Sequence, residues 1–323
     1  MITIKTEIKT DRDWKDFISE NYNLFFDPEF LEYNDVFMKK IVWHHLKFRF
    51  KEKNKIAALM TGCEVMNKGR KTFVSSNGVS FGGLLYGEKI GINDFTKIAT
   101  SFKNYLIENE FSECILKNYP VLYNGSFNEE YEYAFLKSGF HISNYSITNI
   151  IKLAEFDFSK LANPLKRSIR NSSKQVSVNI IDFDKDKNYL DRYYQVLFDN
   201  RLTKKTTPTH SKDELFYLKK KLPHRIILFT AETDNDISGV CVLFVIKPDV
   251  ILNFYLATDS KYKKYRVSDY LLYKTIQWAK EAGFRLYDIG TSDSSGELIE
   301  GLFSFKKKFK ADGYLRKTYS IKL

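Results

Sequence analysis

The sequence predicts an α/β protein built of two similar layered domains, each with a mixed, twisted sheet and flanking helices. The first observation is the order of elements in the last third, where three strand patterns precede a helix, a strand, a helix and a strand. The second is that the first half shows the same order. The third is length, because 323 residues exceed one typical domain and suit two of about 150 residues.

Each element of the last third has a local signal. Apolar runs and alternation predict three strands, over 225–232, 237–246 and 250–257, separated by turn residues such as Asn235 and Pro248. An amphipathic pattern predicts a helix over 268–282, which Gly283 ends. A short buried strand, a helix and a final strand follow, over 285–289, 299–310 and 314–321.

The first half repeats this plan. Period-two patterns predict three strands, over 46–51, 56–65 and 71–75. The elements that follow are a helix, a strand, a second helix and a long strand, over 94–109, 114–117, 130–138 and 141–153. We therefore predict two domains of one duplicated fold, 1–153 and 154–323.

Composition excludes several classes of protein. A hydrophobic share of 43% and an aromatic share of 16% exclude a disordered chain. The three cysteines lie in apolar strand-like runs, and neither they nor the five histidines have metal-ligand spacing, so we expect no metal site. The N-terminal segment does not resemble a signal peptide, and no apolar run reaches the ~20 residues of a membrane span. We expect a soluble, cytoplasmic protein.

The net charge of +11 favours an anionic partner, although a solvated lysine-rich surface explains it equally well. Nucleic acid, a nucleotide-linked substrate and the inner face of a membrane all qualify as partners. Pro164 suits the first turn of a helix that carries Lys166, Arg170 and Lys174 on one face. These cations either bind phosphates, with Arg170 at their centre, or face solvent.

The order of three strands, helix, strand, helix and strand is that of a GNAT-type N-acyltransferase core. The chain resembles the Fem family, the peptidoglycan bridge-forming aminoacyltransferases, and the related Fem-like GNAT proteins of polysaccharide loci. The segments that carry the resemblance are Asp27-Pro28-Glu29-Phe30-Leu31, Leu165-Lys166-Arg167-Ser168-Ile169-Arg170, Val176-Ser177-Val178, Tyr194-Gln195-Val196-Leu197 leading to Arg201, Phe254-Tyr255-Leu256-Ala257, Tyr287-Asp288-Ile289-Gly290 and Gly301-Leu302-Phe303-Ser304-Phe305-Lys306. The resemblance implies tandem GNAT-like domains, with the chemistry in the second.

The resemblance also assigns roles to single residues. It implies that Phe305 and Lys306 border the reaction centre and that Tyr255 matches a tyrosine at the end of the third strand. It further implies that Arg201 holds the phosphates of a nucleotide-linked acceptor. A lysine of the first domain with a similar role corresponds to Lys39 or Lys40.

Acyl transfer to an amine needs two reactants held together, a proton acceptor and a donor for the developing oxyanion. Lys306 would supply positive charge, and Tyr255 would donate a hydrogen bond to the carbonyl or simply pack in the sheet. Asp288 lies in an otherwise apolar run and is either a general base or a structural group. Asp293 lies in the following loop, where acceptors of GNAT enzymes often approach.

The expected donor is an aminoacyl-tRNA or, failing that, an acyl-CoA or acyl carrier, with no tightly bound cofactor. Segment 263–268 has no glycine, whereas a loop that binds the CoA pyrophosphate through backbone amides is normally glycine-rich. We thus expect an acyltransferase that acts on an amine of a cell-wall or surface-polysaccharide precursor. Two alternatives stay open: an acyl-CoA-dependent N-acyltransferase of a nucleotide-linked amino sugar, and a non-catalytic module that binds tRNA or an anionic glycan.

Overall fold

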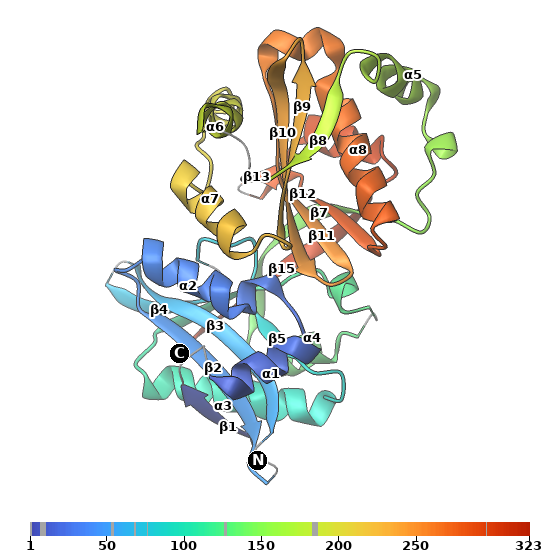
Figure 1. The fold of residues 1–323 in the computed structure, drawn as a ribbon. Coiled ribbons are helices and arrows are strands. Elements are labelled where there is room, and N and C mark those ends of the chain that lie inside the picture. Colours follow the sequence, from blue (N-terminus) through green and yellow to red (C-terminus); the bar gives the residue numbers. More distant parts are fainter. Residues whose placement is uncertain are drawn as a thin grey trace. The chain divides into compact units, whose positions relative to one another are not determined.

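The computed structural model describes residues 2–6, 11–52, 55–67, 69–75, 77–125, 128–182, 187–294 and 296–323 (Figure 1). The chain divides into two compact units. The first comprises Met1–Ser146 together with Leu315–Leu323, and the second comprises Ile147–Tyr314.

These limits differ from a boundary after residue 153 because two long strands each serve both units. The end of β7 (His141–Lys152) pairs antiparallel with β12 (Leu286–Thr291) of the second unit. The end of β15 (Asp312–Lys322) pairs antiparallel with β6 (Glu113–Lys117) of the first unit. The strand pairing, rather than a linker, therefore sets the limits of the units.

The sheet of the first unit has the strand order β1-β2-β3-β4-β6-β15. Its other strands are β1 (Ile2–Thr6), β2 (Trp43–Phe50), β3 (Ile56–Asn67) and β4 (Arg70–Val74), and β5 (Leu84–Tyr86) also pairs with β3. Its helices are α1 (Arg12–Glu20), α2 (Pro28–Phe37), α3 (Ile92–Glu108) and α4 (Glu130–Lys137). Apolar side chains of α3 and α4, including Phe95, Phe102 and Phe135, form the main core with the sheet.

The sheet of the second unit has the order β7-β12-β11-β10-β9-β8. Its other strands are β8 (Ser177–Ile181), β9 (Ile226–Thr233), β10 (Asp236–Lys247) and β11 (Val250–Thr258), and a short hairpin joins β13 (Asp293–Ser294) to β14 (Glu297–Leu298). Its helices are α5 (Asn163–Ser172), α6 (Lys187–Leu202), α7 (Lys212–Lys221), α8 (Val267–Glu281) and α9 (Glu300–Lys307). Helices α5 and α8 cover one face of this sheet, and α6 and α7 lie on the other (Figure 1).

Local residue chemistry explains why these elements end where they do. Asp234 and Asn235 both have positive φ angles, 53° and 61°, as a tight turn between antiparallel strands requires. Gly283, with φ of 83°, follows the end of α8. Pro164 lies in the first turn of α5. The α/β class and the order of elements predicted from the sequence are confirmed.

Candidate functional site

The second unit contains a cavity of about 410 Å³ where strands β11 and β12 separate. The two strands pair in parallel only up to Leu252 and Asp288, and the residues that follow in each strand line the cavity. The lining residues come from the end of α6 and the turn after it, β11, α8, β12 and α9: Asn200, Arg201, Lys204, Asn253, Phe254, Leu256, Thr258, Ser268, Ile289, Gly290, Thr291, Leu302, Phe305 and Lys306. The cavity therefore lies at the point where these two strands stop pairing.

Lys306 extends from α9 into this opening and is almost completely buried, with 3% of its surface exposed. Its Nζ donates hydrogen bonds to the carbonyl oxygens of Gly290, at 2.8 Å, and Thr291, at 2.6 Å. A carbonyl oxygen only accepts hydrogen bonds, so Lys306 is the donor in both. Phe305 also lines the cavity, and its ring lies 5.7 Å from that of Phe309.

The two acidic candidates support the backbone and do not line the cavity. Asp288 is fully buried, and its Oδ1 accepts hydrogen bonds from Thr148 Oγ1 at 2.5 Å and from the Gly290 amide at 2.6 Å. Asp293 accepts a hydrogen bond from the Ile147 amide at 2.9 Å. Asp288 therefore fixes the end of β12, and Asp293 the segment that follows it, against β7.

Arg201 lines the cavity and rests on Tyr255, with its guanidinium carbon 5.3 Å from the centre of the ring. Burial lowers the pKa of Arg201. The Tyr255 hydroxyl is turned away to His210, accepting a hydrogen bond from the His210 amide at 3.1 Å and lying 3.0 Å from its Nδ1. Burial raises the pKa of Tyr255 and lowers the pKa of His210 to about 4, so the imidazole is neutral near neutral pH and its tautomer sets whether the hydroxyl or Nδ1 is the donor.

Lys204, Asn200 and Asn253 are among the lining residues that were not singled out from the sequence. Lys204 lies three positions after Arg201, and its pKa is lowered by burial and by the charge of Arg201. Asn200 donates to the Thr258 carbonyl at 3.0 Å, and Asn253 donates to the Tyr287 hydroxyl at 3.0 Å. The sequence could have indicated Lys204, because it lies three residues after the candidate Arg201. It could not have indicated the asparagines, because their place beside the cavity depends on the fold.

The charged side chains that line the cavity are all basic. Arg201, Lys204 and Lys306 carry positive charge, and no carboxylate occurs among the described residues that line it. Such a site attracts an anionic ligand and disfavours a cationic one.

The glycine-free segment before α8 forms the short 3₁₀ helix η4 (Ser260–Tyr265), followed by Arg266 in a left-handed conformation with φ of 55°. Asp269, in the first turn of α8, is buried. Its Oδ2 accepts hydrogen bonds from Ser168 Oγ at 2.7 Å and from Arg266 Nε at 3.1 Å. A paired carboxylate thus lies at the helix start where a phosphate of CoA would otherwise find favourable backbone amides.

The remaining candidates lie outside this cavity. Arg170 is exposed on α5, 5.6 Å from the ring of Phe158. Lys39 and Lys40 are exposed in the turn after α2 of the first unit. A role in substrate binding for these three residues stays a prediction.

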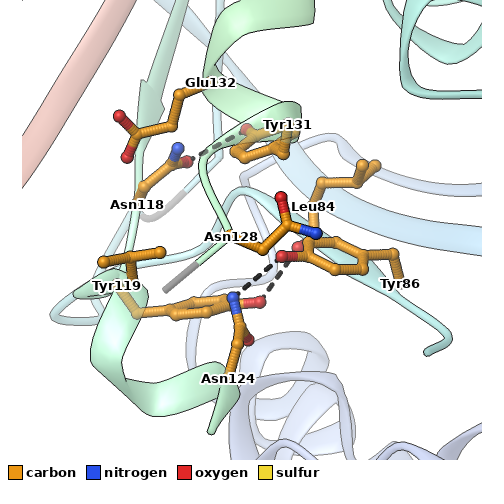
Figure 2. Close-up of a pocket in the computed structure, with 9 residues that line it drawn as sticks. Leu84, Tyr86, Asn118, Tyr119, Asn124, Asn128, Tyr131 and Glu132 are labelled. Carbon is orange, nitrogen blue, oxygen red and sulfur yellow. Dashed lines mark hydrogen bonds between the residues drawn. The ribbon is translucent and has the colours of Figure 1, made fainter. Parts of the chain in front are cut away.

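The first unit has a much smaller cavity, of about 20 Å³, directly after β6 (Figure 2). Tyr131 donates to Asn118 Oδ1, and Asn124 donates to the Tyr86 hydroxyl, at 3.2 and 2.9 Å. The Nδ2 of Asn118 is buried and has no partner among the described residues. This volume accommodates about one water molecule, so an acyl donor does not fit.

Two classes of feature were not found in the part of the chain that the structure describes. No group of three or more His, Cys, Asp or Glu side chains is placed to hold a metal ion. No helix there is long and apolar enough to cross a membrane.

Comparison with known families agrees with this architecture. Residues 159–307 match the family model of an acetyltransferase (GNAT) domain. The second unit is a GNAT acyltransferase domain. No curated protein sequence matches the chain.

Several solved structures are similar to both units of the chain and not only to the GNAT domain. FemX matches with a TM-score of 0.71 at 11% identity, over 99% of this chain and 97% of that one. L-PGS from Bacillus licheniformis matches at 0.64 and 14%, over 97% and 92% of the two chains. A tandem GNAT protein from the clavulanic acid biosynthesis pathway matches at 0.58 and 10%, over 100% and 98%. At these identities the likeness shows the fold, and it confirms the predicted tandem GNAT arrangement and the resemblance to Fem-like acyltransferases.

Proposed function

We propose that this protein transfers an aminoacyl or acyl group to an amine of an anionic cell-wall or surface-polysaccharide precursor. The observation that carries the proposal is the cavity between β11 and β12, which is lined by Arg201, Lys204 and Lys306 and by no carboxylate among its described residues. An activated carbonyl fits the opening between the strands, and the cations suit an acceptor that bears phosphate or carboxylate groups. The first unit, whose cavity holds about one water, would contribute to binding but not to the chemistry.

The proposed step is an ordinary acyl transfer. The amine nitrogen attacks the carbonyl carbon, the new C–N bond forms, and negative charge collects on the carbonyl oxygen. The Lys306 ammonium, held by Gly290 and Thr291, supplies a fixed positive charge for that oxygen. The carbonyl reforms as the bond to the leaving oxygen or sulfur breaks.

Proton balance follows from the same residues. The amine loses one proton and the leaving group gains one. Because no carboxylate lines the described part of the cavity, the proton passes between the reactants or through water. This favours a donor whose leaving group accepts a proton readily, such as the ester oxygen of an aminoacyl-tRNA.

The structure around α8 also supports a donor other than CoA. Asp269 occupies the first turn of that helix with Arg266 as its partner, and the preceding segment has no glycine. A pyrophosphate there would meet a carboxylate, which costs free energy. We place the reaction in the cytoplasm, with peripheral association at the inner face of the membrane where the acceptor is lipid-linked.

The test compares donors and acceptors directly. Purified protein is incubated with aminoacyl-tRNA or acyl-CoA and with a nucleotide-linked amine acceptor, and the acylated product is detected by mass spectrometry. Thermal shift with CoA and with the acceptor alone gives a second, independent readout. Transfer from acyl-CoA, together with stabilisation by CoA, would favour the amino-sugar N-acyltransferase instead. Acceptor binding with no transfer from any donor would indicate a binding module.

A further inference from the structure

We infer that Asp288 is a positioning residue for Lys306: it fixes the turn at Gly290 whose carbonyl oxygen, with that of Thr291, holds the lysine ammonium. The inference rests on the proposed function for its effect on rate, but its structural part is tested without any substrate. It also replaces the alternative in which Asp288 is the general base.

The strand pairing around Asp288 contains an irregularity. In β12, Asp288 pairs with Ile150 of β7, but the next pair is Thr291 with Thr148. Two residues of β12 therefore stand opposite one residue of β7, which is the arrangement of a β-bulge. Bulges redirect the backbone groups of the strand that contains them.

Gly290 lies inside this bulge with φ of +86°, a left-handed conformation that favours glycine. Its amide donates to Asp288 Oδ1 at 2.6 Å, a bond that closes a short turn between residues two apart. Thr148 donates to the same oxygen at 2.5 Å and so fixes the carboxylate on β7. One carboxylate oxygen thus joins the bulge to the neighbouring strand.

The bulge presents two consecutive carbonyl oxygens to Lys306. Gly290 O and Thr291 O accept from Nζ at 2.8 and 2.6 Å, although in a regular strand successive carbonyls point in opposite directions. The position of the ammonium therefore depends on the bulge, and the bulge depends on Asp288. A displacement of about 1 Å at a reacting group costs roughly 100-fold in rate.

Asp288 itself is poorly placed to act on substrate. It is fully buried and is not among the residues that line the cavity. A general base must come within ~2.6–3.2 Å of the proton that it removes, directly or through one water. Thr148 Oγ1 and the Gly290 amide both donate to its Oδ1, and these bonds hold the carboxylate against strand β7 and the local backbone rather than in the cavity.

The first experiment separates the two roles by chemistry. Asp288→Asn keeps an Oδ1 acceptor for Gly290 and Thr148, whereas Asp288→Ala removes it. A positioning role predicts that kcat falls within ~10-fold for Asp288→Asn and by about 100-fold for Asp288→Ala, with KM little changed. Equal, near-complete loss in both variants would identify a base and overturn the inference.

The second experiment needs no activity. An amine-specific acylating reagent is applied to the full-length protein, and the modification of each lysine is measured by mass spectrometry. Buried Lys306 should be protected relative to exposed Lys307. Protection should persist in Asp288→Asn and fall by about 10-fold or more in Asp288→Ala, because the ammonium leaves its two carbonyls. Unchanged protection in Asp288→Ala would overturn the inference.

A matched pair on β7 keeps the test valid if Asp288→Ala does not fold. Thr148→Ser keeps the hydroxyl donor and Thr148→Val removes it with little change in shape. Lys306 should become more reactive in the valine variant than in the serine variant. Thr233→Val, which removes a buried hydroxyl from the far end of β9, controls for general loss of stability. Absence of transfer with every donor would contradict the proposed function while leaving the labelling result to judge the role of Asp288.

Discussion

Lys306→Met is the most direct perturbation of the proposed reaction. It removes the ammonium and keeps an unbranched side chain of similar length on α9. Loss of one preorganised donor to a developing oxyanion costs about 100- to 1,000-fold in kcat, or ~2.7–4 kcal/mol. The Gly290 and Thr291 carbonyls also lose their donor, which costs up to ~1–3 kcal/mol of stability each if water does not replace it. Because both face a cavity, we expect water to recover much of that loss.

The adjacent residue provides a matched control. Lys307 is exposed and pairs with Asp312 at 3.0 Å on the surface, where such a pair contributes less than ~1 kcal/mol. Steady-state kcat and KM are measured for both variants with the donor that supports transfer, and unfolding in urea is followed in parallel. Lys306→Met should lose kcat with little change in KM, and Lys307→Met should behave like wild type. A kcat for Lys306→Met within about threefold of wild type would refute the electrostatic role.

Three further predictions concern the residues behind and beside the cavity. Arg201→Ala should raise KM for the anionic acceptor about 30-fold or more with a smaller effect on kcat, and Arg201→Lys should recover part of the loss; acceptor titrations check this. Tyr255→Phe should cost about 1–2 kcal/mol of stability through the lost bonds to His210 but leave kcat within about threefold, and a larger fall in kcat would restore Tyr255 as a donor to substrate. Burial lowers the pKa of His210 from 6.5 to about 4, so the unfolded chain binds its proton first and stability falls as pH drops below about 6.5; wild type should lose about 2 kcal/mol more than His210→Gln between pH 7 and pH 5 in urea unfolding.

The order of strands and helices was predictable because its signals are local. Turn residues separate strands β9, β10 and β11, and the apolar periodicity of α3 and α8 is strong. Helices α1 and α2 were not predicted, although the sequence contains start signals for both. Asp11 and Asp27 cap their first turns, and Pro28 opens α2. The capping box of Ser211 and Glu214 marks α7 in the same way. These helices were missed because short amphipathic segments beside polar turns resemble loops.

The limits of the two units could not be read from the sequence. Strands β7 and β15 are each continuous in sequence, and only their pairing partners show that their two ends belong to different units. Pairing between residues more than a hundred positions apart leaves no local pattern. From the sequence, a boundary is naturally placed after a complete strand. In the structure the limits fall inside β7 and β15, because the two ends of each strand belong to different units.

Which candidate residues line the cavity depends on the element that carries them. Phe305, Lys306 and Arg201 lie on helices near the cavity, and all three line it. Tyr255 lies on β11, where a bulge in the pairing with β10 makes Asn253 and Phe254 both line the cavity although they are adjacent. Strict alternation does not predict which face a side chain takes after such a bulge, so the tyrosine points to His210 instead.

The two units share one topology but differ at the opening that we propose as the reaction centre. Strands β4 and β6 of the first unit pair in parallel, as β11 and β12 do in the second, but the bridge between Gly82 and Asn118 continues the contact beyond the end of β4. Buried Phe81 packs against Tyr119 there, with ring centres 5.8 Å apart. In the first unit, aromatic side chains and asparagines thus fill this region. In the second unit, charged and small polar residues line the corresponding region and leave it open. Since the fold is common to both, the proposed function assigns the reaction to the side chains at the opening of the second unit, and substitutions there should stop transfer.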